Sequence, residues 1–135
     1  MPGSASRLPA WFGERHDLPR VVQAGLPVAV EGGFFPGWGR QVSPDDVPRA
    51  AAEEAAATGG WCKLIVDWIT DEGGYAATMS PELVAEATRA ARAAGGRIAV
   101  HTQSAEGGRA AVRRFLDEGR RLGLITVPVR PEWTE

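Results

Sequence analysis

The chain has 135 residues, of which 44% are hydrophobic and 24% are charged, as in one ordinary globular domain. A formal net charge of −2 and a pI of about 5.7 argue against a nucleic-acid-binding protein or a membrane-surface protein. The single cysteine, Cys62, excludes an intramolecular disulfide, and no apolar run approaches the ~18–20 residues of a membrane span. We therefore expect a cytoplasmic protein with neither nucleic acid nor membrane as its partner.

The N-terminal region, residues 1–20, is expected to be irregular, because prolines and a glycine interrupt every periodic pattern there. The periodic segments that follow predict one α/β domain over residues 21–129. The last residues, 130–135, are polar and form a predicted tail.

A short apolar strand is predicted over residues 27–31, followed by a glycine-rich loop that carries Phe35 and Trp38. Aromatic side chains in such a loop can shape an apolar substrate pocket, and Trp68 and Tyr75 are further candidates for the same role. The alternative is that these rings only pack against the core.

Two segments begin with serine, proline and an acidic residue, which is the chemistry of a helix start, and each ends at a Gly-Gly pair. Each predicted helix leads into a short apolar strand, so the chain repeats a helix–strand unit typical of α/β folds. The predicted parallel strands lie near residues 27–31, 61–67, 97–101 and 124–128, and the predicted helices near 44–58, 81–94 and 105–122.

The strand over residues 61–67 contains the strongest functional signal. Alternation of side chains predicts that Lys63 and Asp67 share one face, and the next strand ends in His101. Carboxyl ends of neighbouring parallel strands are where α/β folds place their ligands. A buried lysine needs a partner or a chemical modification, and an ion pair with Asp67 is the simpler possibility.

His101 also has a simpler interpretation. A histidine at the end of a strand can cap the following loop through Thr102 or Ser104. As a metal ligand it offers an imidazole nitrogen, whereas a lysine binds a metal only after reaction with carbon dioxide to a carbamate.

The segments Trp61-Cys62-Lys63-Leu64-Ile65-Val66-Asp67-Trp68 and Ile98-Ala99-Val100-His101-Thr102, with the alanine-rich helix between them, resemble the amidohydrolase superfamily. The most similar branch is that of the imidazolonepropionase- and prolidase-like metal-dependent hydrolases, and the resemblance covers roughly residues 20 to 112. It implies part of a (β/α)8 barrel, with Lys63 as the carbamylated ligand and His101 as a second ligand. It further implies one or two divalent metal ions, commonly zinc, and hydrolysis of an amide or ester-like bond in a small molecule by a metal-activated water. Asp67, at the end of the strand that carries Lys63, is a candidate catalytic residue.

The sequence departs from the family in three ways: it lacks the paired His-x-His of the first strand, the histidine of the sixth strand and the aspartate of the eighth. We therefore expect an incomplete site that needs a homo-oligomer or a complementing chain. The alternatives are a non-catalytic truncated remnant and an open, flavodoxin-like α/β domain that binds a small molecule or a partner.

Overall fold

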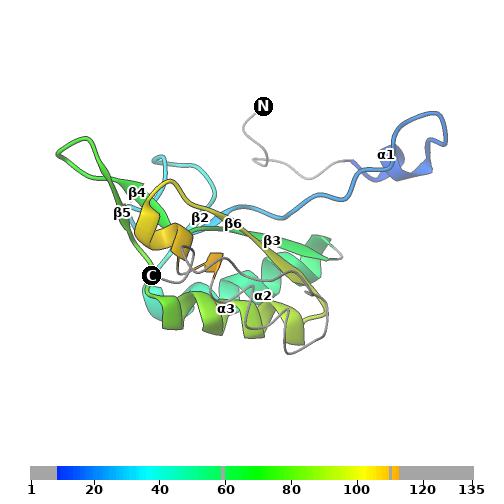
Figure 1. Cartoon of the computed structure of the whole chain (residues 1–135). Helices are drawn as coiled ribbons and strands as arrows, with labels where there is room; N and C mark the ends of the chain where they lie inside the picture. The colour runs from blue at the N-terminus through cyan, green and yellow to red at the C-terminus, as the bar shows by residue number, and fades with distance from the viewer. Residues whose placement is uncertain (1–8, 59, 110, 113–135) are drawn as a thin grey trace, which may run out of the picture.

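A four-stranded parallel sheet forms the centre of the computed structural model, which describes residues 9–58, 60–109 and 111–112. The strands are β1 (Val28–Val30), β2 (Arg40–Val42), β3 (Trp61–Ile65) and β6 (Arg97–His101), in the order β2-β1-β3-β6 (Figure 1). The predicted α/β class is therefore confirmed, and the strands expected near 27–31 and 97–101 are present.

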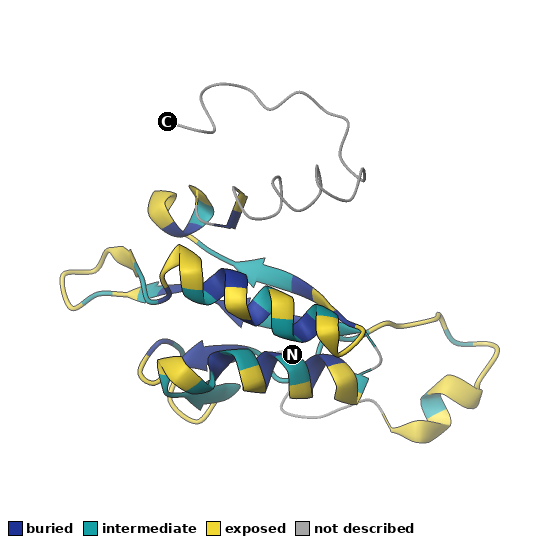
Figure 2. Ribbon diagram, turned by 90° about the horizontal axis from the view of Figure 1, so that it is seen from below, coloured by how far each residue is buried: buried dark blue, intermediate teal, exposed yellow. Residues whose placement is uncertain are grey.

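Two long helices, α2 (Val47–Thr58) and α3 (Pro81–Ala93), lie against the same face of the sheet (Figure 1). Both follow the predicted helix starts. The short 3-10 helix η1 (Pro44–Asp46) precedes α2, and the Ser80 side chain caps α3 by accepting a hydrogen bond of 3.2 Å from the Leu83 amide. Their buried stripes face the sheet and their exposed stripes face solvent (Figure 2).

The core lies between this face of the sheet and the two helices. Small alanines on the helices allow close approach to the larger side chains of the strands. The cluster contains Val28, Val30, Val47, Ala50, Ala51, Ala55, Cys62, Leu64, Val66, Met79, Val84, Ala87, Ala91 and Ile98.

The end predicted for the strand over residues 61–67 is wrong, because the parallel pairing stops at Ile65. The Val66 amide donates to the carbonyl oxygen of His101, the last residue of β6, at 3.2 Å. The chain then enters a separate antiparallel pair, β4 (Asp67–Ile69) with β5 (Tyr75–Ala77), which was not predicted. The hairpin turn closes through the Thr70 amide, which donates to the Gly74 carbonyl at 2.8 Å.

Strand β2 was not predicted, because a glycine-rich stretch precedes it and a helix start follows it at once. The Arg40 amide donates to the carbonyl of Pro27 at 2.8 Å, and the Glu31 amide donates to that of Val42 at 3.0 Å. Gly39 has a φ of +66° and packs against the Pro27 carbonyl, a conformation and a closeness that favour glycine. The loop therefore returns the chain to the edge of β1.

The remaining predictions concern the two ends of the chain. The N-terminal segment is extended and carries one short helix, α1 (Ala10–Glu14), which lies apart from the sheet (Figure 1). Residues 105–109 are helical, as predicted for the start of the third helix. The rest of the helix expected over 105–122, the strand expected near 124–128 and the tail over 130–135 lie outside the described residues.

Candidate functional site

Lys63 and His101 lie on the same face of the sheet, on neighbouring strands. The register pairs Lys63 with Ala99 and Ile65 with His101, so the two candidate ligands are diagonal neighbours. From a strand spacing of about 4.8 Å and a rise of about 3.3 Å per residue, their Cα atoms are roughly 8 Å apart. Two side chains at that spacing can reach a common ligand.

This shared face is opposite the face that α2 and α3 cover. Cys62 and Leu64 point into the core, so Lys63 points away from it. Lys63 and His101 are both half-buried. Lys63 is therefore half-buried rather than buried, and within the described part of the chain no ion pair joins it to Asp67.

The Asp67 carboxylate is fully buried and binds the loop that follows β6. Its Oδ2 atom accepts hydrogen bonds from the Thr102 hydroxyl at 2.7 Å, the Gln103 amide at 2.7 Å and the Ser104 amide at 2.6 Å. Burial raises the pKa of Asp67, but these hydrogen bonds outweigh burial and hold the pKa below its ordinary value. Asp67 Oδ1 is buried and has no hydrogen-bond partner among the described residues.

The His101 ring contacts Gln103. Its Nε2 atom lies 3.3 Å from the Nε2 atom of the Gln103 amide, and no bond to Thr102 or Ser104 is formed in the described region. The loop-capping role that the sequence suggested for His101 is taken instead by Asp67. Sequence reasoning missed Gln103, because a glutamine two residues after a strand carries no recognisable signal.

Four aromatic rings form a cluster from the loop after β1 and from β4. The ring centroids of Phe35 and Trp68 are 4.7 Å apart in an edge-to-face arrangement, and Phe34 lies 5.1 Å from Trp68. Trp38 joins through Phe35 at 5.8 Å. Three of the four predicted substrate-binding aromatics are thus brought together, whereas Tyr75 lies beside Ile69 in the hairpin and makes none of these ring contacts within the described residues.

Phe35 is 51% exposed and Trp38 is 44% exposed. The edges of the aromatic cluster therefore face solvent, even though its rings pack on one another. This exposed apolar surface is available to a ligand.

The described residues offer only part of the ligand set that a metal centre needs. No group of three His, Cys, Asp or Glu side chains comes together among them. Lys63, if converted to a carbamate, and His101 would offer two ligands, whereas catalytic zinc sites take three protein ligands and leave one position open. A metal therefore requires at least one further ligand from elsewhere.

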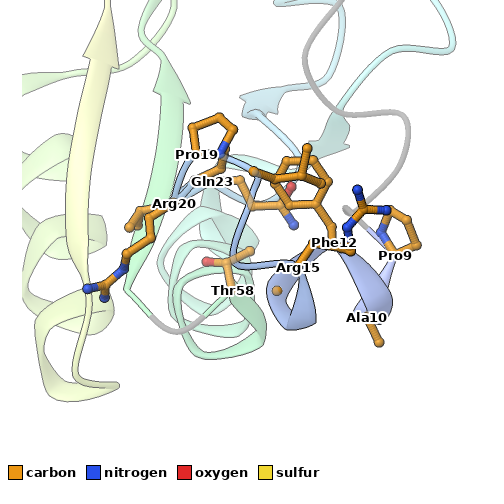
Figure 3. Close-up of a pocket in the computed structure, with 12 residues that line it drawn as sticks. Pro9, Ala10, Phe12, Arg15, Pro19, Arg20, Gln23 and Thr58 are labelled. Carbon is orange, nitrogen blue, oxygen red and sulfur yellow. The ribbon is translucent and has the colours of Figure 1, made fainter.

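A separate pocket of roughly 450 Å³ lies between the N-terminal arm and the end of α2 (Figure 3). Phe12, Arg15 and Arg20 from the arm and Thr58 from α2 are among its lining residues. Neither Lys63 nor His101 lines it, so it is not part of the candidate centre. The irregular sequence of the arm gave no signal for this pocket.

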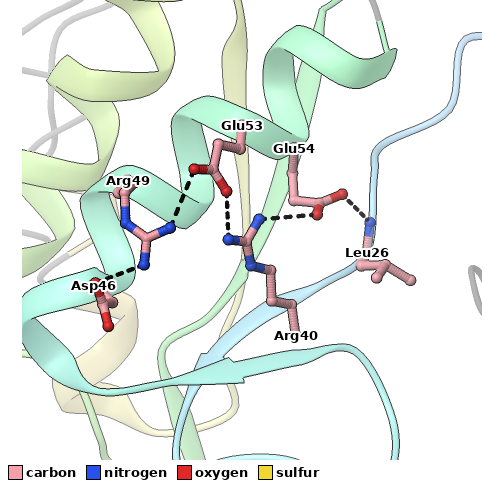
Figure 4. A network of polar contacts seen from close by, with 6 residues as sticks. All are labelled: Leu26, Arg40, Asp46, Arg49, Glu53 and Glu54. Carbon is pink, nitrogen blue, oxygen red and sulfur yellow. Dashed lines mark hydrogen bonds and ion pairs between the residues drawn. The ribbon is translucent and has the colours of Figure 1, made fainter.

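The sequence also gave no indication of a buried acidic residue on α2. Glu54 is 5% exposed and accepts a hydrogen bond of 2.9 Å from the Leu26 amide. Arg40 forms ion pairs with Glu54 and with Glu53, and Arg49 extends the network (Figure 4). This network fixes the chain entering β1 against α2 and β2, on the other side of the sheet from Lys63.

Comparison with known proteins gives no family. No family model matches the chain, and no solved structure matches it. An uncharacterized protein of Mycobacterium bovis and two of Mycobacterium tuberculosis are each 32% identical to it over 93 residues. The match covers 67% of this chain and 25% of each relative, so the chain spans about a quarter of the length of the curated relatives it matches.

Within residues 9–58, 60–109 and 111–112, no helix has the length and apolar character needed to cross a membrane. The expected cytoplasmic location stays a prediction.

Proposed function

We propose that this chain carries part of the metal centre of an amidohydrolase-type hydrolase, with Lys63 as a carbamate and His101 as two of its ligands. The observation that carries the proposal is their position as diagonal neighbours on the sheet face opposite α2 and α3. The resemblance implies the same two residue types on successive strands. The metal would be zinc or another divalent ion, one or two per completed centre.

The proposed larger architecture is part of a (β/α)8 barrel. In such barrels the helices cover the outside of a parallel sheet, and ligand-binding side chains come from the inner face near the carboxyl ends of the strands. The position of α2 and α3 on one face of the parallel strands β1, β3 and β6 supports that plan, whereas β2 follows β1 without a helix and lies on the other side of it, outside the strand order of a barrel. The missing ligands would come from a second copy of the chain, paired at the outer strands of the described sheet, β2 and β6, so that the purified chain can complete the centre by itself.

A metal in the completed centre would supply Lewis-acid activation of water for hydrolysis. The residues of this chain would hold and orient it. The catalytic role predicted for Asp67 depends on Oδ1, which accepts no hydrogen bond from the described residues, because Oδ2 already accepts three. Since Oδ1 is buried, proton transfer to a substrate would require the loop after β6 to move.

The substrate would be a small molecule with an amide or ester-like bond. Phe35, Trp38 and Trp68 provide an apolar surface near the carboxyl ends of the strands, and Tyr75 extends it along the hairpin. This surface favours a substrate with an apolar group next to the bond that is cleaved.

A non-catalytic α/β domain that binds a small molecule or a partner is the second candidate, either as a truncated remnant or as a domain in its own right. The observation in its favour is that the described residues offer two metal ligands rather than three.

An assay of hydrolysis with a panel of aryl esters and acyl-dipeptides distinguishes the hydrolase from the non-catalytic domain. The hydrolase proposal expects turnover that a chelator abolishes and zinc restores, and that Lys63→Ala and His101→Ala both remove. His16→Ala is the matched control, because His16 is exposed in the N-terminal arm, and this variant should retain turnover. Absence of metal-dependent turnover by the wild-type chain would favour the non-catalytic domain.

A further inference from the structure

The side chain of Gln103 is the polar group in contact with the His101 ring among the described residues. The distance between their Nε2 atoms is 3.3 Å. A neutral imidazole has one nitrogen that donates and one that accepts, so a partner at Nε2 favours one tautomer over the other. With the amide NH2 group facing the ring, Gln103 donates, His101 Nε2 accepts and the ring proton lies on Nδ1.

The backbone that carries this glutamine is itself fixed. Its amide donates to Asp67 Oδ2 at 2.7 Å, and the residues on either side, Thr102 and Ser104, donate to the same oxygen. A further restraint comes from Gly107, whose amide donates to the Ser104 hydroxyl at 2.9 Å. The buried carboxylate therefore holds the first three residues after His101 as a unit.

We propose that Gln103, held in place by Asp67, is a positioning residue that sets the tautomer and the ring orientation of His101. In this tautomer the one available lone pair of the ring is on Nε2, so a metal would bind at Nε2 and replace the Gln103 amide there. The inference deepens the proposed function and rests on it for its importance, because His101 is the histidine assigned to the metal. The contact itself is a property of the metal-free chain.

The test is the nitrogen-15 spectrum of the histidine rings in the metal-free 135-residue chain at pH 8.5. The two neutral tautomers of a histidine ring give distinct ring-nitrogen shifts, and a mildly alkaline buffer favours these neutral forms. The chain has two histidines, so His16 in the N-terminal arm serves as an internal reference. His16→Gln assigns the two sets of signals.

Gln103→Leu removes the amide at an exposed position and should leave the fold intact. The expected result is one predominant tautomer for His101 in the wild type and a clear shift toward the other tautomer in Gln103→Leu. Asp67→Asn, which weakens the hold on the loop, should shift the population in the same direction. Gln41→Leu is the matched control, since Gln41 binds the loop after β1, and it should leave the His101 signals unchanged.

An unchanged tautomer population in Gln103→Leu would overturn the inference, whatever the metal measurements show. A shifted population together with no metal-dependent hydrolysis would keep the positioning role of Gln103 and reject the hydrolase function. The two proposals therefore fail separately.

Discussion

The carboxylate of Asp67 accepts a hydrogen bond of 2.7 Å from the hydroxyl of Thr102, 35 residues further along the chain. This contact joins the end of β3 to the loop that follows β6, and both strands carry a candidate metal ligand. Replacing Asp67 by asparagine should lower the free energy of unfolding at pH 7 by about 2–4 kcal/mol, because buried hydrogen bonds to a charged group are lost or weakened. Urea unfolding followed by circular dichroism measures this loss.

The same contact predicts that the stability of the fold depends on pH. Burial raises the pKa of Asp67, but the hydrogen bonds from Thr102, Ser104 and Gln103 outweigh it, so the folded-state pKa is lowered. A lowered pKa means that the carboxylate stabilises the fold fully above its unfolded value of about 3.9, and that this contribution is lost as the pH falls through the folded-state pKa. The stability gap between wild type and Asp67→Asn should therefore narrow below about pH 4. A gap that stays constant down to acid unfolding would contradict this account.

Gly107 and Gly108 give a matched test of the packing around this carboxylate. A Cβ atom on Gly107 would lie 2.7 Å from Thr102 Oγ1 and 2.9 Å from Asp67 Oδ2, whereas on Gly108 its nearest neighbour would be 4.0 Å away. Gly107→Ala should destabilise the fold by roughly 1–3 kcal/mol through overpacking. Gly108→Ala should be neutral or stabilising by about 0.5–1 kcal/mol, since alanine is the better helix former. Thermal unfolding measures the change in stability of each variant. If both substitutions changed the stability equally, the described packing around Gly107 would be contradicted.

Glu54 and Glu53 are adjacent acids with different surroundings. The Glu54 side chain is 7% exposed and also binds the Leu26 amide, whereas the Glu53 side chain is 48% exposed. Glu54→Ala should cost roughly 3 kcal/mol, because it leaves Arg40 without its buried partner and the Leu26 amide without an acceptor. Glu53→Ala should cost less than about 1 kcal/mol, as for other exposed ion pairs. If chemical denaturation gave both variants the same stability, Glu54 would not have the structural role assigned to it.

Cys62 should be inert in the folded chain. It is fully buried, and burial, with a smaller effect from the charge of Glu54, raises the pKa of its thiol to about 12. Since the thiolate is the reactive form, a disulfide reagent at pH 8 should label the native chain only as fast as the chain unfolds. The urea-unfolded chain should react at once, and immediate labelling of the native chain would show that the thiol is accessible.

The sequence predicted the elements whose signals are local. Helix starts at Ser43 and Ser80, and the Gly-Gly pairs that end the helices, depend on neighbouring residues, and both helices form where expected. The strands at Val28–Val30 and Arg97–His101 follow from short apolar runs in the same way.

Features that depend on contacts between distant residues could not be predicted. Strand β3 ends at Ile65 because its neighbour β6 ends at His101 and because residues 75–79 return to pair with the chain beyond it. Strand β2 exists because a glycine turn brings Arg40 back to Pro27. At the candidate site, alternation placed Lys63 correctly on the face shared with His101, but the binding of Asp67 to the loop around Gln103 spans 36 residues.

The central claim is that Lys63 and His101 together hold a metal. Its most direct test is the zinc content of the chain, purified with zinc and bicarbonate and measured by inductively coupled plasma mass spectrometry. The account predicts bound zinc in the wild type and in His16→Ala, and its loss in both Lys63→Ala and His101→Ala. Zinc content that is the same in all four proteins, or a wild-type chain that binds none, would contradict it.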